Sequence, residues 1–242
     1  MNKPRRESAG FSNSPTKQSK SSKAQHSAVD HTIKEREAVA LINQGRVDEA
    51  ETIYKELITT ETKNHIVYGN LAAICGMKGR SDEVIKLLRQ ALELKPNYPE
   101  AHNNLGNAFR GKGDLDDAII NYKRALELDP KNSKAFYGIG RVQVIKGNLK
   151  DSKESFDKSI ELNQSNTAAL FQLSRNIESD EDSRELAKKL DRVTRTGLDK
   201  KQKSMLEFAA ANINHKSKNY AKAAQCLSKA NKLKLSYYPS DL

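Results

Sequence analysis

The chain has 242 residues, of which 36% are hydrophobic and 30% charged, with a formal net charge of +11 at pH 7. No apolar run approaches the roughly 20 residues of a membrane-spanning helix, and the N-terminus lacks the apolar region of a secretory signal. Cys75 and Cys226 form no CxxC pair, which argues against a disulfide framework or a zinc site. We therefore expect a thin, elongated core in a cytoplasmic protein.

The excess positive charge lies at the two ends of the chain. Residues 1–30 combine lysine and arginine with many serines and two prolines, a composition that cannot offset chain entropy by burial, so we expect a disordered basic tail. The second basic region is the C-terminal third, whose cations include Lys188, Lys189, Arg192, Lys200, Lys201 and Lys203. The middle of the chain is nearly neutral.

A repeat of 34 residues runs through the middle of the chain. Gly45, Gly79, Gly113 and Gly147 are spaced by this period, and two further columns keep the same register: Ala50, Val84, Ala118 and Ser152; and Tyr54, Leu88, Tyr122 and Phe156. Self-similarity at one period indicates a repeat architecture. The predicted units are residues 31–64, 65–98, 99–132 and 133–166.

Each unit is predicted to form two helices, most clearly in residues 99–132. Apolar residues recur at helical spacing on both sides of Gly113, which accepts the left-handed conformation of a helix end. Asp114 is predicted to cap the second helix through its side chain, and Asp129-Pro130 to end it. Small residues are expected where the helices cross closely: Gly106, Ala118 and Ala125.

These residues carry a family resemblance. The pattern of Leu105-Gly106, Phe109, Gly113, Ala118, Tyr122, Ala125 and Pro130 resembles the tetratricopeptide repeat. The resemblance implies an all-α fold, a right-handed superhelical solenoid of helical hairpins. The middle units keep the pattern best and the outer units drift from it, as capping units do.

The array is predicted to continue irregularly after residue 166. Residues 167–177 are expected to begin a partial fifth unit, residues 178–204 to form a charged linker and a helix, residues 205–235 to form a degenerate hairpin, and residues 236–242 a tail. The segment 208–234, FAAANINHKSKNYAKAAQCLSKANKLK, is similar to the segment that joins repeats to the catalytic domain in bacterial tetratricopeptide-containing sulfotransferases. The phosphate-binding loop that follows in that family does not occur in this sequence.

The residues give no sign of catalytic, cofactor-binding or metal-binding chemistry. The GxG pairs at Gly111 and Gly138 fall on structural repeat positions rather than after a strand. The histidines share no helix face at metal-ligand spacing, and no pair of carboxylates is singled out. We expect a chain that is not an enzyme and needs no cofactor. His102 and Cys75 occupy repeat positions that are usually aromatic, so we interpret both as packing residues.

The tetratricopeptide resemblance implies a concave groove lined by the first helix of each unit. Amides suit a peptide backbone and arginines suit carboxylates, so the groove predicts a protein or peptide partner with acidic residues. An ordinary solvated helix face is the alternative interpretation. The predicted groove residues are Asn70, Asn103, Asn104, Asn107, Arg110, Lys134, Tyr137, Arg141, Phe171 and Arg175.

The residues of this register match two recognition modes known from repeat families only in part. In the clamp that grips a C-terminal carboxylate, Asn104 and Lys134 match, but Gly69, Ala73 and Gly138 replace the other three residues, so this mode is not expected. Asn70 and Asn104 also resemble two rungs of the asparagine ladder in O-linked N-acetylglucosamine transferases, where amides hold the substrate backbone.

Three functional hypotheses follow from the sequence. The first is a non-catalytic interaction module, and the second is the substrate-recognition region of a truncated or split sulfotransferase or related transferase. The third is a nucleic-acid binder that uses the basic C-terminal third, although this region lacks interleaved aromatic residues and any recognisable nucleic-acid module.

Overall fold

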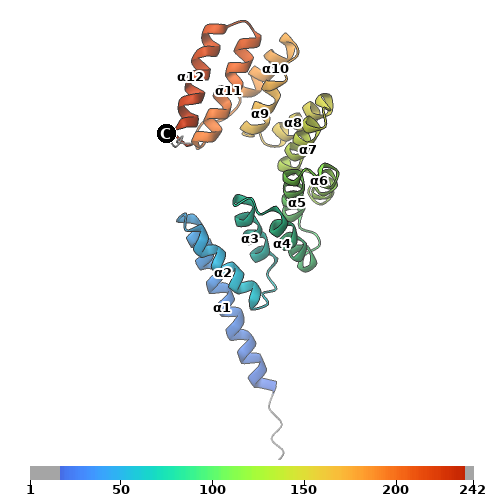
Figure 1. Cartoon of the computed structure of the whole chain (residues 1–242), viewed down its shortest axis with the longest axis vertical. Coiled ribbons are helices and arrows are strands. Elements are labelled where there is room, and N and C mark those ends of the chain that lie inside the picture. Colours follow the sequence, from blue (N-terminus) through green and yellow to red (C-terminus); the bar gives the residue numbers. More distant parts are fainter. Residues whose placement is uncertain (1–16, 238–242) are drawn as a thin grey trace, which may run out of the picture. The chain divides into compact units, whose positions relative to one another are not determined.

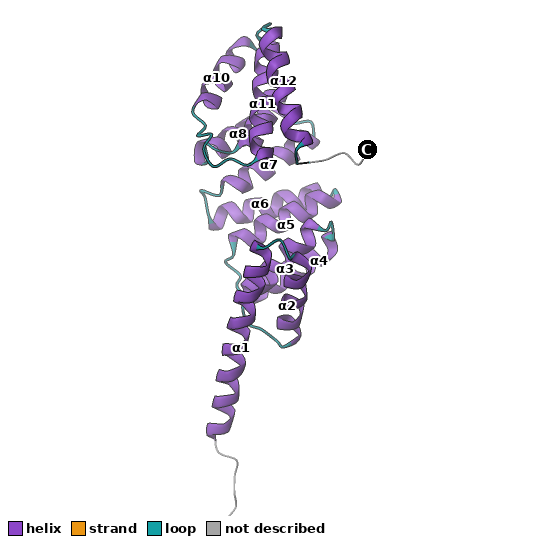
Figure 2. Ribbon diagram, turned by 90° about the vertical axis from the view of Figure 1, so that its left-hand side faces the viewer, coloured by secondary structure: helices purple, strands orange, loops and turns teal. Residues whose placement is uncertain are grey.

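A computed structural model describes residues 17–237, with side chains from residue 30 onward. The described chain is helical throughout and contains no strand (Figure 2). No helix within it is long and apolar enough to cross a membrane. The helices, in chain order (Figure 1), are α1 Lys17–Asn43, α2 Val47–Thr59, α3 His65–Met77, α4 Ser81–Leu94, α5 Pro99–Lys112, α6 Leu115–Leu128, α7 Ser133–Ile145, α8 Leu149–Leu162, α9 Thr167–Arg175, α10 Asp180–Asp191, α11 Lys200–Lys216 and α12 Tyr220–Leu235.

The chain divides into two compact units, Met1–Leu71 and Ala72–Leu242. In the first, α1 and α2 form a hairpin whose core contains Ala38, Tyr54 and Leu57. Its two helices are also joined at the surface, where the Lys34 ammonium lies 2.7 Å from a Glu56 carboxylate oxygen. The repeat hairpin therefore begins with α1, which supplies the first helix of the first unit.

The structure has helix in part of the segment for which composition predicts disorder. Helix α1 begins at Lys17, whereas residues 1–16 lie outside the described residues. The physical reason is local: residues 17–43 contain neither proline nor glycine, and their lysines, alanines and glutamines are good helix formers. Low burial potential and helix propensity are separate properties, so a segment with too few apolar residues to build a core can still form a helix.

The second unit, Ala72–Leu242, stacks helical hairpins in sequence, among them α5 with α6, α7 with α8 and α11 with α12. The predicted all-helical hairpin array is confirmed. Its core contains the small residues Ala118 and Ala125, and the large side chains of Tyr122 and Phe156, all almost fully buried. Small residues let neighbouring helices approach, and the two rings fill the space between successive hairpins.

The turn between the helices of each repeat closes through the backbone. Gly113 has φ 90°, and the other glycines of its column, Gly45, Gly79 and Gly147, also have positive φ, as predicted. The predicted side-chain cap at Asp114 is wrong, because its carboxylate makes no capping bond to α6. Instead, the Asp114 N–H donates to the Phe109 carbonyl at 3.0 Å, which satisfies the end of α5 without a capping side chain.

The boundaries after residue 177 differ from the predicted segments. The acidic residues assigned to a linker form the first turn of α10, where Ser179 and Asp182 make a reciprocal capping box. Helix α11 begins five residues before the predicted hairpin, at Lys200, because Asp199 and Gln202 form a second capping box. Both boundaries follow from acceptors that satisfy free N–H groups at a helix start.

Candidate peptide-binding surface

The first helices of successive repeats carry a row of residues 34 positions apart. The row pairs Asn103 with Asn107 on α5, Tyr137 with Arg141 on α7 and Phe171 with Arg175 on α9. Residues four apart are neighbours on a helix surface. The Arg141 guanidinium lies 6.0 Å from the centroid of the Tyr137 ring, and that of Arg175 lies 5.9 Å from the Phe171 ring. Each ring therefore holds an arginine on its helix through a cation–π contact.

Tyr122 reaches the same surface from the second helix of its repeat. Its ring lies between Gly106 of α5 and Gly138 of α7, where an added Cβ atom would stand 2.6 Å and 2.4 Å from ring carbons. The Tyr122 hydroxyl donates a hydrogen bond to the Oδ1 atom of Asn107 at 2.9 Å. The two glycines thus let a core side chain from α6 present its polar end beside the α5 row.

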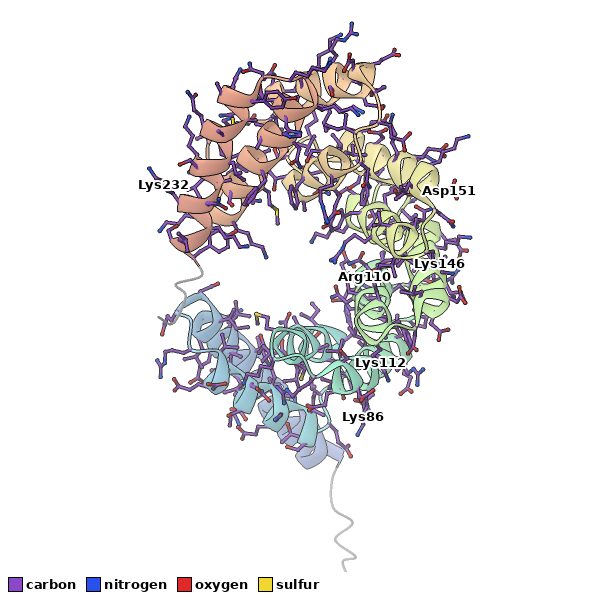
Figure 3. The ribbon with its side chains drawn as sticks, turned by 45° about the horizontal axis from the view of Figure 1, so that its top comes forward. Lys86, Arg110, Lys112, Lys146, Asp151 and Lys232 are labelled. Carbon is purple, nitrogen blue, oxygen red and sulfur yellow. The ribbon has the colours of Figure 1, made fainter. Side chains whose placement is uncertain are left out.

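Arg110 and Arg141 give this part of the surface a positive charge. Burial raises the pKa of Tyr122, and the nearby guanidinium groups of Arg110 and Arg141 act in the opposite direction. The buried Nε atom of Arg110 has no hydrogen-bond partner. Figure 3 shows Arg110 on the inner side of the curved Ala72–Leu242 unit and Lys146 on its outer side.

The arginines of the surface are not neutralised by carboxylates. Among the described residues, the ion pairs of arginine involve Arg46, Arg80, Arg124 and Arg195. Arg110, Arg141 and Arg175 form none within the described part of the chain. The positive charge of the row is therefore available to a ligand.

The other predicted groove residues differ in accessibility. Lys134 and Arg175 are exposed, and Tyr137 and Phe171 are half-buried. Asn103 is only 5% exposed and donates from Nδ2 to the Oδ1 atom of Asn104 at 3.4 Å, so it offers a ligand little surface. At the same repeat position the longer side chains of Tyr137 and Phe171 are half-buried, so they are more accessible than Asn103.

Asn70 belongs to the Met1–Leu71 unit. Its Nδ2 atom donates to the Tyr54 hydroxyl at 3.0 Å. A tyrosine hydroxyl and an asparagine amide thus meet in this unit, as Tyr122 and Asn107 do further along the chain. The predicted place of Asn70 in one groove with Asn104 stays a prediction.

A pocket beside the α5 row was not predicted from the sequence. We call it the small-residue pocket; it has a volume of about 370 Å³. The walls come from Ala72, Ala73 and Gly76 of α3, Ser81 and Val84 of α4, and Asn104, Asn107, Ala108 and Gly111 of α5. The available signal was Ala73 and Gly76, which stand at positions where the next repeat has the larger Asn107 and Arg110.

A second cavity, of about 330 Å³, lies among α8, α9 and α10, and its charges are largely paired. The Lys189 ammonium lies 2.6 Å from carboxylate oxygens of both Asp157 and Glu185, and Lys153 pairs with Asp182. Two of these pairs, Lys189–Asp157 and Lys153–Asp182, connect α8 to α10. We therefore interpret them as structural contacts that hold the irregular helix α10.

Replacing Asp182 with alanine should destabilise the protein by about 1 kcal/mol at pH 7, which is the usual effect of a lost helix cap. Asp182 contributes both to the capping box of α10 and to the contact with Lys153. Hydrogen bonds from Lys153 and Ser179 lower the pKa of Asp182 from 3.8 to about 2. A depressed pKa stabilises the fold above pH 4, and this contribution is lost as the pH falls toward 2. Urea unfolding between pH 7 and pH 2 measures the difference between wild type and variant, which should shrink below pH 4; a constant difference would contradict the assignment.

The described side chains contain no group of three or more His, Cys, Asp or Glu residues arranged to hold a metal ion. Cys75 and Cys226 are both buried, and neither forms a disulfide. His102 is half-buried, and its Nδ1 atom lies 3.4 Å from the Oδ1 atom of Asn121 on α6, so it packs between the helices of its hairpin.

Family comparison agrees with the geometry of the hairpins. Models of the tetratricopeptide repeat match residues 99–132 and 133–166, and a further repeat model of this type matches residues 77–113. Residues 77–166 therefore carry tetratricopeptide repeats. These matches lie within residues 77–166, so the similarity of residues 208–234 to sulfotransferases stays a prediction.

Solved structures share the tetratricopeptide fold over most of this chain. The structure of PilF from Pseudomonas aeruginosa has 16% identity and a TM-score of 0.68, with coverage of 89% of this chain and 95% of that one. PilW, described as a widely conserved type IV pilus biogenesis factor, has 17% identity and a TM-score of 0.63, with 87% and 94% coverage. MamA from Desulfovibrio magneticus has 14% identity and a TM-score of 0.54, with 88% and 97% coverage. At these identities the likeness shows the fold alone, and no curated protein matches the sequence.

Proposed function

We propose that the protein is a non-catalytic interaction scaffold that binds an extended, acidic peptide segment along α5, α7 and α9. The observation that carries the proposal is that Arg110, Arg141 and Arg175 have no carboxylate partner within the described residues. Arg141 and Arg175 are also held over aromatic rings. Guanidinium groups pair with carboxylates in a bidentate geometry, so an acidic ligand would supply the missing partners. The amides of Asn104 and Asn107 are suited to bond the ligand backbone.

The proposal is supported by the difference between this surface and the charged surface near α10. Lys153 and Lys189 already contact carboxylates of their own chain, whereas Arg110, Arg141 and Arg175 form no ion pair within the described residues. Burying a cation without an opposite charge is costly, and an acidic ligand removes that cost for the partly buried Arg110. We infer that the row is the recognition surface and that the protein works through its partner, in the cytoplasm.

The test is a variant with Asn104, Asn107 and Arg141 all replaced by alanine. A peptide is first selected on the wild-type protein from a random displayed library, and its affinity is then measured by fluorescence anisotropy. We expect binding at least tenfold weaker in the variant, because a lost charge-assisted pair and two lost amide bonds each weaken the complex. Helix content by circular dichroism should stay unchanged.

The matched control is Arg124→Ala on α6, which removes an exposed arginine that pairs with Glu127. Binding by this variant should equal that of the wild type. If the triple variant binds the selected peptide as well as the wild type does, the surface on α5 and α7 is not the binding site and the proposal is wrong.

A further inference from the structure

Two neighbouring slots between first helices differ in what fills them. Tyr122 fills the slot between α5 and α7, where Gly106 and Gly138 make room for its ring. One repeat earlier, Leu88 stands at the position of Tyr122, and it has neither a ring nor a hydroxyl. The slot between α3 and α5 therefore keeps an open volume, the small-residue pocket of about 370 Å³.

The small-residue pocket has the composition of an aliphatic side-chain site. Its walls are mostly methyl groups and backbone, from Ala72, Ala73 and Ala108 together with Gly76 and Gly111, over Val84. Ala73 is exposed, so the pocket opens to solvent beside this residue. Asn107 on α5 and Arg141 on α7 occupy the same repeat position as Ala73, so the pocket opens on the surface that carries them. Apolar walls with a few placed amides are typical of a ligand pocket.

The next slot is filled by Tyr122, and the surface where its hydroxyl emerges has the composition of a carboxylate site. The Tyr122 hydroxyl and the Asn107 amide lie at its centre, already joined at 2.9 Å. Arg110 and Arg141 are the cations near that hydroxyl, one from each of the two helices, and the Nε atom of Arg110 is buried without a partner. A carboxylate placed here would accept from both guanidinium groups.

We propose that these two slots read a two-part motif in the bound peptide: an aliphatic side chain in the small-residue pocket and a carboxylate side chain between Arg110 and Arg141. Packed helices lie roughly 8–10 Å apart, and an extended chain advances about 3.3 Å per residue. The two side chains should therefore be about two to three residues apart, in either chain direction. This inference rests on the proposed function and specifies which peptide motif the proposed surface recognises.

The first experiment selects binders from a random nonapeptide library on the wild-type protein, the Arg110→Gln variant and the Ala73→Leu variant. On the wild type we expect enrichment of Leu, Ile or Val two to three positions from Asp or Glu. Arg110→Gln should lose the acidic preference and keep the aliphatic one. Ala73→Leu fills the pocket from an exposed helical position and should lose the aliphatic preference and keep the acidic one.

The second experiment measures coupling by fluorescence anisotropy with one selected peptide and its Glu→Gln or Leu→Ala forms. Arg110→Gln and the peptide Glu→Gln change should each weaken binding at least tenfold, and together they should cost little more than either alone. Ala73→Leu should weaken binding of the leucine peptide and spare the alanine form. Ala224→Leu, at an exposed position on α12, and Arg124→Gln are the matched controls and should bind as wild type does.

The outcomes separate this inference from the proposed function. Binders that need Asn104, Asn107 and Arg141 but show no paired aliphatic and acidic preference would overturn the two-part motif and leave the scaffold proposal standing. Binders that ignore all of these residues, or a library without enriched sequences, would overturn both. Additive effects of Arg110→Gln and the peptide Glu→Gln change would show that the carboxylate binds elsewhere.

Discussion

Replacing Gly138 with alanine should lower the free energy of unfolding by about 2–3 kcal/mol, the upper part of the range expected for overpacking in a tight core. The new Cβ atom would stand 2.4 Å from the Tyr122 ring, closer than any van der Waals contact allows. The ring has no free space in which to move, because Gly106 faces its other side and its hydroxyl is bonded to Asn107. Helices α5 and α7 must therefore separate.

Gly111→Ala on α5 is the matched control for this prediction. The nearest atom to a Cβ at Gly111 is the Ser81 Oγ atom at 3.8 Å, which is an ordinary contact. Alanine is favoured over glycine inside a helix by roughly 0.5–1 kcal/mol, so this variant should be slightly more stable than wild type. Urea unfolding followed by circular dichroism measures both.

A second variant tests whether Tyr122 is the cause. In a Tyr122→Leu background the ring is absent, so adding alanine at 138 should cost little or nothing, and the two changes should be strongly non-additive. If Gly138→Ala is as stable as wild type, or if its cost is the same with leucine at 122, then the ring does not fill this slot.

The repeat hairpins could be predicted because several local signals agreed with one period. The glycine column at Gly45, Gly79, Gly113 and Gly147 marks the helix ends, and all four residues have positive φ in the structure. Gly106 was predicted at a close helix crossing, and Tyr122 packs directly on it. The absence of a side-chain cap at Asp114 could not be predicted from the sequence, because the backbone angles of the turn decide whether a carboxylate reaches a free N–H group.

The candidate site was predictable only in part, because burial depends on neighbours that a single helix pattern does not show. The pattern placed Asn103 with Asn107, yet Asn103 is buried and Asn107 is exposed. The small-residue pocket depends on Leu88 standing where another repeat has Tyr122, a comparison between units rather than within one. The sequence placed Lys189 only in the basic C-terminal third, but two carboxylates contact it, one from α8 and one from its own helix α10.

Replacing Phe156 with alanine should destabilise the end of the array by about 3–5 kcal/mol, the usual cost of removing a buried phenylalanine ring. Phe156 is 1% exposed and belongs to one apolar cluster with Leu170 of α9, Leu186 of α10 and Leu206 of α11. Its ring also lies 5.8 Å, between centroids, from that of Tyr137 on α7. One side chain therefore joins the regular repeats to the irregular helices that follow them.

The helices that lose stability in Phe156→Ala distinguish a local contact between repeats from a general loss of stability. In a repeat array each unit contacts mainly its neighbours, so the loss should stay near the altered interface. Hydrogen exchange should show faster exchange in α8 to α11 of Phe156→Ala, with α4 and α5 protected as in wild type. The control Phe156→Leu fills most of the space and should cost clearly less. Equal acceleration along the whole unit Ala72–Leu242 would mean that the unit unfolds as one body, and the surface on α5 and α7 would then depend on the C-terminal helices for its stability.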